Sequence, residues 1–316
     1  MKEKILSIYI PTYNRADKVT GLLRFLMCEI EKIDSKNIEV IVNNNASSDD
    51  TEQKVKELIE GSSIIYHKNN ENLGIVGNAY MAASLVTGKY VWIIGDDDIL
   101  VEGIVGRVYD ILCNNQNISY VYLNYAKLDE KESPVYLGET CLVKNGYEQL
   151  MQEKKEGLAR IILTSSSIYL TTCLIETVKN IPLTEEGSYG WSLYASLAAI
   201  KKGYSFFDST VWVYNNDGNA SWRNIAYDAW MGNIRSFIRL DKVGYSRKEI
   251  KEIYRCWIDK TFLGGYIVAQ FLKTRDFRRF FKDYFFCFKQ IPIKVIYLSL
   301  NIICSELKKQ RGGEKN

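Results

Sequence analysis

The sequence predicts an α/β fold in which a mostly parallel sheet carries helices on both faces and a helical appendage follows. Two observations predict the sheet: short apolar runs rich in β-branched residues alternate with amphipathic segments over the first hundred residues, and polar loops separate them. Strands joined by helices form parallel sheets through right-handed crossovers. A third observation predicts the appendage, because the last third of the chain is dense in basic and aromatic residues.

Apolar periodicity predicts four strands in the first hundred residues, each but the last followed by a helix. The first strand ends at a turn that begins with Pro11. The predicted strands are 6–10, 38–42, 64–67 and 90–94. The helices that follow the first three strands are 18–33, 51–59 and 76–86. Such sheets bind ligands outside the carboxyl ends of their strands. We therefore expect the polar loops 12–15, 43–50 and 96–98 to converge at one edge.

The remaining sequence predicts fewer strands and more helix. The predicted elements are a helix at 102–114, a strand at 120–125, apolar elements at 165–174 and 191–200, and a strand at 211–214. We therefore expect a domain at 1–225, with halves 1–100 and 101–225, and a helical region at 226–316.

Composition limits the class of protein. The 316 residues are 47% hydrophobic and 25% charged, which suffices for a packed core. A net charge of +3 does not indicate nucleic acid, because such binding needs basic residues gathered on one face. The seven cysteines form no CxxC pair, which argues against a zinc site and for reduced thiols. The apolar stretch before Pro11 is too short for a signal peptide or a spanning helix, so we expect a cytoplasmic protein.

Three consecutive aspartates, Asp96, Asp97 and Asp98, follow the fourth predicted strand. Adjacent carboxylates resist simultaneous ionisation unless a cation lies among them. Mg²⁺ and Mn²⁺ prefer oxygen ligands, usually one or two carboxylates together with substrate phosphates. On a strand, Asp96 and Asp98 would share one face and Asp97 would take the other. The alternatives are a solvated acidic turn, or Asp98 as the cap of the helix at 102–114.

Four motifs occur in order within residues 5–100: IPTYNR at 10–15, NNNASSDDT at 43–51, NENLGIVGN at 70–78 and TGKYVWIIGDDD at 87–98. Together they resemble the inverting family 2 glycosyltransferases of GT-A fold, and WIIGDDDIL is similar to the abequosyltransferase-like branch of surface-polysaccharide assembly. The resemblance implies a Rossmann-like GT-A sheet with donor half 1–100 and acceptor half 101–225. It also implies a nucleotide-sugar donor and a Mn²⁺ or Mg²⁺ ion. Beyond residue 130 the resemblance is weak.

The resemblance also implies site residues. Asn44 stands where the family has an acid that pairs with the base, and an amide can still hydrogen-bond a pyrimidine edge. Asp97 falls at the position credited with metal coordination, while Asp96 and Asp98 offer a second DxD pair, so all three are metal candidates. Asp49 matches a turn residue that either caps the next helix or contacts ligand. The implied donor-binding residues are Pro11, Thr12, Tyr13, Asn14, Arg15, Asn44, Asn45, Asn72, Gly74, Asn78, Asp96 and Asp97.

An inverting transfer needs a general base, usually a carboxylate, to take the proton of the acceptor hydroxyl. The acidic pair that members of the family carry before a helix ending in Gly-Tyr is missing at the corresponding place. Glu185 and Glu186 lie just upstream and are the candidates. The alternatives are that both are solvated loop residues, or that the base is Asp217 or Asp129. Trp191 is the candidate for acceptor contact, although tryptophan more often packs in a core.

Residues 271–304 combine aromatic and aliphatic side chains with seven lysines and arginines. Cations that meet anionic headgroups, with rings at the acyl boundary, are typical of a segment that lies in a membrane interface. The charges interrupt this segment too often for a spanning helix. The sequence therefore predicts contact with the inner leaflet, and the alternative is a helical hairpin packed on the catalytic domain with its cations in water.

We therefore expect an inverting glycosyltransferase that moves a sugar from a nucleotide-sugar donor to a lipid-linked glycan or oligosaccharide acceptor in capsule or O-antigen type synthesis. It would work in the cytoplasm, peripheral on the cytoplasmic face of the membrane. The alternative is a catalytically degenerate GT-A domain that binds nucleotide or glycan without turnover. A nucleotidyltransferase is disfavoured, because the sequence has no basic, glycine-rich phosphate loop near the first strand.

Overall fold

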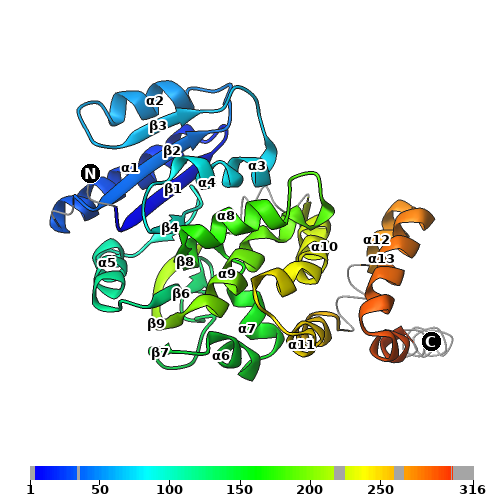
Figure 1. Cartoon of the computed structure of the whole chain (residues 1–316). Coiled ribbons are helices and arrows are strands. Elements are labelled where there is room, and N and C mark those ends of the chain that lie inside the picture. The colour runs from blue at the N-terminus through cyan, green and yellow to red at the C-terminus, as the bar shows by residue number, and fades with distance from the viewer. Residues whose placement is uncertain (1–3, 34–35, 217–224, 260–266, 300, 302–316) are drawn as a thin grey trace, which may run out of the picture.

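The computed structural model describes residues 4–33, 36–216, 225–259, 267–299 and 301. Within them the strands form one nine-stranded sheet in the order β3-β2-β1-β4-β8-β6-β9-β5, with β7 on β9. Strands β3, β2, β1 and β4 are parallel neighbours, and helices flank them (Figure 1). The elements of this part are β1 (Leu6–Thr12), α1 (Ala16–Ile33), β2 (Ile38–Asn44), α2 (Thr51–Leu58), β3 (Ile65–Lys68), α3 (Gly74–Tyr80), α4 (Ala82–Leu85) and β4 (Tyr90–Ile93).

The other half of the sheet is mixed. Strand β8 (Ser167–Leu170) is antiparallel to β4 and to β6 (Ile118–Lys127), whereas β9 (Tyr204–Asn215) runs parallel to β6. Two short strands, β5 (Ile99–Leu100) and β7 (Cys141–Val143), are antiparallel to β9. The helical elements are α5 (Ile104–Asn114), α6 (Gly146–Gln152), α7 (Lys155–Arg160), η1 (Thr164–Ser166), α8 (Thr171–Asn180), η2 (Glu186–Gly190) and α9 (Trp191–Lys202).

Both faces of the sheet are buried. Along β1, Leu6, Ile8 and Ile10 share one core with apolar residues of α1 and α5, whereas Tyr9 belongs to a second core with residues of α3, α8 and α9. Successive side chains of a strand point to opposite faces, so cover on both sides requires a continuous apolar run. The predicted arrangement of helices on both faces is confirmed.

Most predicted elements agree with the structure, with three differences. The helix predicted at 76–86 is two short helices, α3 and α4, which meet at Met81. The apolar element predicted at 165–174 is divided between η1, β8 and the start of α8. Strands β5 and β7 were not predicted, because strands of two or three residues carry no periodic pattern.

The C-terminal region is helical, as predicted, and consists of α10 (Ala226–Ser236), η5 (Phe237–Val243), α11 (Arg247–Trp257), α12 (Ala269–Thr274) and α13 (Phe277–Gln290). Apolar residues of α10, η5 and α11 belong to the same core as α9, so one core extends past residue 225. Helices α12 and α13 lie at the edge of the molecule (Figure 1). None of the described helices has the length and hydropathy that crossing a bilayer requires.

Two glycines bring η2 and α10 into close contact. A Cβ atom added at Gly190 would lie 2.5 Å from the carbonyl oxygen of Gly232, and one added at Gly232 would lie 2.6 Å from the Cβ of Tyr189. Neither position can accept a side chain unless backbone moves. Because α9 begins at Trp191, directly after Gly190, this contact sets the position of that tryptophan.

We predict that Gly190→Ala lowers the free energy of unfolding by about 1–3 kcal/mol, because the added methyl group overpacks the contact between η2 and α10. Gly21→Ala is the matched control, since Gly21 lies within α1 and an added Cβ there meets nothing within 4 Å. Alanine at that position should raise the stability by about 0.5–1 kcal/mol. Urea denaturation followed by circular dichroism measures both variants, and equal stabilities would contradict the tight contact.

Candidate functional site

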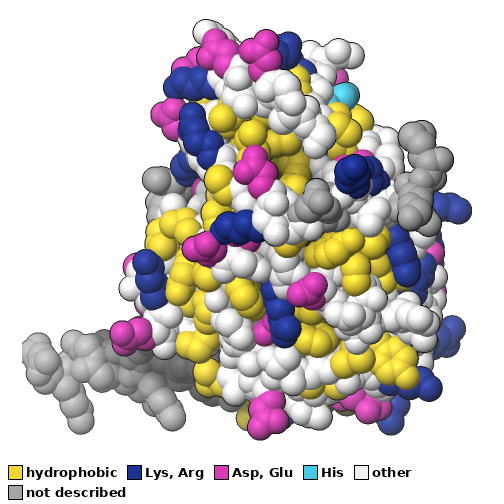
Figure 2. Space-filling model, turned by 90° about the vertical axis from the view of Figure 1, so that its left-hand side faces the viewer, with side chains coloured by type: hydrophobic (Ala, Val, Ile, Leu, Met, Phe, Trp, Pro, Cys, Tyr) yellow, Lys and Arg dark blue, Asp and Glu magenta, His cyan; other side chains and the backbone are white. Residues whose placement is uncertain are grey.

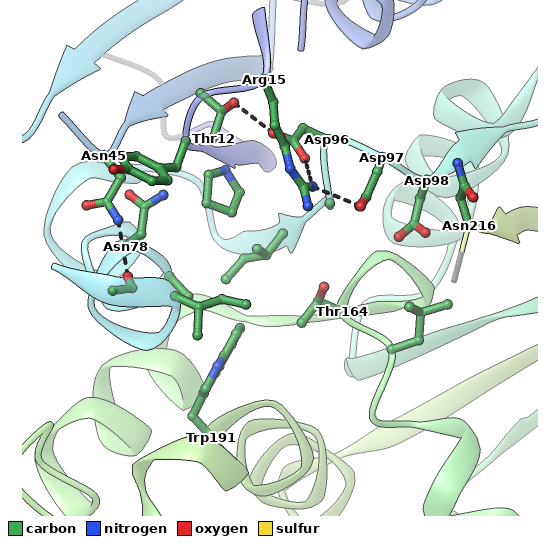
Figure 3. A pocket seen from close by; sticks show the side chains of 18 of the residues that line it. Thr12, Arg15, Asn45, Asn78, Asp96, Asp97, Asp98, Thr164, Trp191 and Asn216 are labelled. Carbon is green, nitrogen blue, oxygen red and sulfur yellow. Dashed lines mark hydrogen bonds and ion pairs between the residues drawn. The ribbon is translucent and has the colours of Figure 1, made fainter. Parts of the chain in front are cut away.

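A cavity of about 430 Å³ opens at the carboxyl ends of β1, β2 and β4 (Figure 3). Residues from the loops after all three strands line it, which confirms the predicted convergence. Helix α3 with the loop before it, η1 with the residue before it, the start of α9 and the end of β9 contribute the remaining wall. The lining residues are Pro11, Thr12, Tyr13, Arg15, Asn45, Asn72, Gly74, Ile75, Asn78, Ala79, Ile93, Gly95, Asp96, Asp97, Asp98, Leu163, Thr164, Trp191, Asn215 and Asn216.

Arg15 bridges two of the three aspartates (Figure 3). Its Nη1 atom lies 2.6 Å from Oδ1 of Asp96 and 2.8 Å from Oδ2 of Asp97. The hydroxyl of Thr12 donates to the other oxygen of Asp96 at 2.7 Å. Burial raises the pKa of Asp96, although the nearby charge of Arg15 acts in the opposite direction. The ion pair therefore holds buried negative charge at the edge of the cavity.

Asp98 faces a different set of partners. Its Oδ2 accepts from the Ser165 hydroxyl at 2.5 Å, and its Oδ1 accepts from the Asn215 amide at 2.9 Å. Burial raises the pKa of Asp98 to about 6, while these hydrogen bonds act to lower it. The carboxylate thus joins the loop after β4 to η1 and β9.

The expectation that Asp96 and Asp98 share a face is wrong, because β4 ends at Ile93 and residues 96 and 97 form a turn that has no strand alternation. Asp98 does not cap the next helix either. Helix α5 begins after Gly103, and the backbone N–H groups of Gly103 and Val105 donate to the carboxylate of Glu29.

The donor set of the acidic pair fits a hard cation. Asp96 and Asp97 place carboxylate oxygens at the cavity edge, and Mg²⁺ or Mn²⁺ typically takes one or two carboxylates with phosphates and water. Across the described part of the chain, no three His, Cys, Asp or Glu side chains converge as a metal site would require. Asp98 in particular is turned away from the pair. A metal held by this pair would complete its coordination with water or with the oxygens of a bound substrate.

Asparagines shape the wall of the cavity next to β2. The amide nitrogen of Asn45 donates to Oδ1 of Asn72 at 2.8 Å and to the carbonyl of Gly74 at 3.3 Å. Its oxygen accepts from the amide of Asn69 at 2.9 Å and from the backbone N–H of Leu73 at 3.0 Å. The side chain of Asn45 therefore holds the loop that leads into α3.

Two of the predicted donor-binding residues do not line the cavity. Asn14 has a positive φ of 51°, and its side-chain oxygen accepts from the backbone N–H of Ser48 at 2.8 Å. Asn44 is fully buried, donates to the Tyr66 hydroxyl at 2.8 Å and accepts from the backbone N–H of Ser47. Both amides hold the loop after β2, and Asn44, which uses both ends of its amide, is not available to a ligand in this arrangement.

Asp49 also belongs to this loop, and the resemblance implies that it either caps the next helix or contacts ligand. Its carboxylate accepts from the backbone N–H and the hydroxyl of Thr51, the first residue of α2. Asp49 does not line the cavity, so its position agrees with the structural role at the start of that helix.

The second half of the chain contributes a wall that the sequence analysis largely missed. Trp191, which it named, lines the cavity on the side across from Arg15 (Figure 3). Thr164 and Asn216 were not named, and no motif surrounds either of them. The only signal was the position of Asn216 at the end of a predicted strand and the start of a turn, which is typical of an active-site loop.

The two glutamates predicted as the general base lie outside the cavity. Glu185 pairs with Arg239 at 2.6 Å, and Glu186 pairs with Arg235 at 2.7 Å and with Lys282. Burial acts to raise the pKa of Glu186, but the hydrogen bond from Lys282 and the charge of Arg235 outweigh it and lower that pKa. The lowered pKa makes Glu186 a weaker base, and the ion pairs hold both carboxylates outside the cavity.

The two alternative bases are placed as follows. Asp129 lies in an exposed turn after β6, and Asp217 falls outside the described residues. Among the described residues, Asp96, Asp97 and Asp98 are the carboxylates that line the cavity.

Residues 7–170 match the family model for glycosyl transferase family 2, and two relatives are similar to part of the chain. Abequosyltransferase RfbV of Salmonella typhimurium is 31% identical over 172 residues, which make up 54% of this chain and 48% of that protein. GalNAc(5)-diNAcBac-PP-undecaprenol beta-1,3-glucosyltransferase of Campylobacter jejuni is 32% identical over 129 residues, or 40% and 39% of the two chains. The matched regions thus span less than half the length of these relatives.

Two solved structures share the fold. TarS of S. aureus in complex with UDP has a TM-score of 0.67 and 14% identity, covering 93% of this chain and 83% of that chain. Mannosyltransferase PcManGT from Pyrobaculum calidifontis, in complex with GDP-Man and Mn2+, has a TM-score of 0.56 and 13% identity, covering 88% and 78%. At such identities the likeness concerns the fold alone, and it confirms the predicted GT-A fold.

We predict that Asp96→Ala destabilises the ligand-free protein more than Asp97→Ala does. The side chain of Asp96 is 4% exposed and that of Asp97 is 19% exposed, and only Asp96 also binds Thr12. Loss of the Asp96 carboxylate leaves the buried Thr12 hydroxyl without its partner and leaves Arg15 with Asp97 alone, which should cost about 2–3 kcal/mol. Asp97→Ala should cost less than about 1 kcal/mol. Urea denaturation without nucleotide or metal compares them, and equal losses would contradict the separate roles.

Proposed function

The chain belongs to glycosyl transferase family 2, since the family model matches more than half of it, and we propose that it is an inverting, metal-dependent glycosyltransferase. It moves a sugar from a nucleotide-sugar donor to a lipid-linked glycan or oligosaccharide acceptor in surface-polysaccharide synthesis. The observation that carries this proposal is the cavity at the carboxyl ends of β1, β2 and β4, where Arg15, Asp96 and Asp97 lie across from Trp191 (Figure 3).

The donor is proposed to bind along the loops after β1 and β2. Tyr13 lines this cavity and is 41% exposed to solvent, which suits stacking of its ring on a nucleobase. The guanidinium of Arg15 has a planar fork of donors that matches phosphate oxygens as well as carboxylates. A diphosphate next to Asp96 and Asp97 would therefore give Arg15 a second anionic partner.

The divalent ion is proposed to bind Asp97 and Asp96 together with the donor diphosphate. Bound there, Mg²⁺ or Mn²⁺ would supply positive charge opposite the departing nucleoside diphosphate, where negative charge develops. The structural neighbour that carries GDP-Man and Mn2+ supports this assignment. The chain itself contributes the carboxylates and the neutralising charge of Arg15.

The acceptor is proposed to approach the side of the cavity formed by Trp191, Leu163 and Ile75, where a tryptophan face can pack on a sugar ring. A lipid-linked acceptor is supported by the relative whose name includes PP-undecaprenol. Such an acceptor is confined to a bilayer, so we place the protein in the cytoplasm, peripheral on the cytoplasmic face of the membrane, with contact through residues 271–304.

The second candidate function, a domain that binds nucleotide or glycan without turnover, is less well supported, because the chain matches a transferase family. It would have to rest on one observation. Glu185 and Glu186 are paired outside the cavity, so within the described residues no carboxylate beyond Asp96, Asp97 and Asp98 reaches the cavity to act as a base. The two functions differ in whether a bound nucleotide sugar is consumed.

We predict that a nucleoside diphosphate raises the melting temperature only together with Mn²⁺. A ligand that binds the folded state alone stabilises it by about 2.7 kcal/mol at about 100 times its Kd. Thermal denaturation with UDP, GDP, CDP, ADP and thymidine diphosphate, each with and without Mn²⁺, identifies the base, and Mn²⁺ alone is the control. A panel without any shift would contradict the donor site and favour glycan binding.

We predict that Asp97→Ala lowers kcat by at least about 100-fold, because charge stabilisation of the leaving diphosphate is lost. Circular dichroism should show an unchanged fold. Asp110→Ala is the matched control, since Asp110 is an exposed carboxylate on α5, away from the cavity. The assay follows release of the nucleoside diphosphate from its nucleotide sugar. Activity of Asp97→Ala near that of the wild type would refute the metal site.

A further inference from the structure

Helix α13 carries an apolar face that no described part of the chain covers. Phe277, Phe281 and Phe285 recur at every fourth residue on one side of the helix, with exposed fractions of 61%, 50% and 58%, and we call them the aromatic face. Further large apolar side chains exposed in the flanking segments are Leu272, Ile293, Ile296 and Tyr297. Exposed apolar residues gathered in this way mark a binding surface.

Basic residues border the aromatic face. Arg278 and Lys289 are exposed on the same helix, and Arg275 is exposed just before it. Between residues 271 and 299 the chain has seven lysines and arginines but two aspartates, one of which, Asp283, is buried. By contrast, the side of the molecule on the left of Figure 1 shows acidic and basic side chains interspersed (Figure 2). The apolar rings therefore lie within a local excess of positive charge.

The opposite side of α13 anchors the helix to the body. Asp283 is buried and binds Arg235 and Tyr227 of α10. The guanidinium of Arg235 also lies 5.0 Å from the centre of the Phe286 ring. Cys287, one turn beyond Asp283, is fully buried. Because these contacts hold one side of the helix, the aromatic face is directed away from the body, at the edge of the molecule (Figure 1).

We propose that the aromatic face and its basic border dock on the surface of an anionic bilayer. Phenylalanine rings at the acyl boundary and cations at the headgroups are the two contributions that hold an amphipathic helix in a membrane interface. The local positive charge complements the negative potential of a cytoplasmic leaflet.

A second copy of this chain is the less suitable occupant. Pairing two aromatic faces would bring the cations around one helix next to the same cations of the other, and like charges in contact oppose association. An anionic lipid surface removes this repulsion and covers the same rings.

A series of direct contacts connects the docking surface to the proposed acceptor side of the cavity. Lys282 of α13 binds Glu186 of η2, and η2 leads directly into Trp191, which lines the cavity. The purpose of this membrane contact rests on the proposed function, because a bilayer bound here would hold the cavity near an acceptor that is confined to lipid. Lipid binding itself requires neither the donor site nor a metal.

The test is sedimentation of the full-length protein with vesicles of phosphatidylcholine, with and without phosphatidylglycerol, in the absence of nucleotide and metal. We expect binding to the anionic vesicles only, reduced at least about tenfold in Phe277→Ser/Phe281→Ser/Phe285→Ser. The matched control replaces three apolar residues exposed elsewhere, Ile65, Leu137 and Leu142, by serine and should bind like the wild type.

A second pair of variants tests the basic border. Arg278→Glu/Lys289→Glu should lose binding to the anionic vesicles, and added salt should weaken binding of the wild type, because the headgroup attraction is screened. Arg24→Glu/Lys36→Glu, which reverses two exposed charges near the other end of the molecule, is the control and should keep binding. Circular dichroism confirms that each variant is folded.

Three results would overturn the proposal: no binding of the wild type, equal binding to neutral and anionic vesicles, or full binding by the triple serine variant. Wild-type self-association that the same serines abolish, without vesicle binding, would instead assign the face to a second copy. Asp97→Ala should bind vesicles like the wild type. Loss of sugar transfer would therefore not contradict membrane docking, and loss of vesicle binding would not contradict the donor site.

Discussion

The site depends on one electrostatic constraint, which is that a single guanidinium, that of Arg15, holds the carboxylates of both Asp96 and Asp97. Without a cation between them, two adjacent anions at the end of a buried strand would repel each other and favour protonation of one. Arg15 follows β1 and the acids follow β4, and these strands are paired in the sheet. The ion pair therefore fixes the loops after two neighbouring strands to each other, and these loops form the edge of the cavity. When a diphosphate and its metal bind there, the metal would take the place of Arg15 beside the aspartates, and Arg15 would bind the diphosphate. No charge at this edge would then be left without a partner.

Much of the first half could be predicted because its determinants are local. Strand β1 is buried on both faces, so its sequence is an apolar run that only Ser7 interrupts between residues 6 and 10. The loops at 12–15 and 96–98 must meet once the strands are parallel. The direction of side chains inside these loops does not follow from topology. Asp96 and Asp98 separate because β4 ends at Ile93, and a turn replaces the strand alternation on which the expectation depended.

The second half was harder to predict because contacts between distant residues decide it. Glu185 and Glu186 are close to Trp191 in sequence, which suggested a place in the cavity. Arg239 and Arg235, which lie well beyond them in the chain, hold the two carboxylates elsewhere, and a long-range ion pair leaves no local pattern. Asn44 shows the same limit on a shorter scale. Its position matches a base-binding acid, yet Tyr66 and Ser47 use both ends of its amide.

Element η2 connects the two surfaces on which the proposals rest. Its first residue, Glu186, binds Lys282 of α13, and the residue after its last leads into α9 as Trp191. The close approach of Gly190 and Gly232 holds η2 against α10, and α10 in turn holds α13 through Arg235 and Asp283. None of these ties uses Arg15, Asp96 or Asp97. A bilayer that engages α13 would therefore fix the acceptor side of the cavity while leaving the ion pair of the donor side free to exchange its partners.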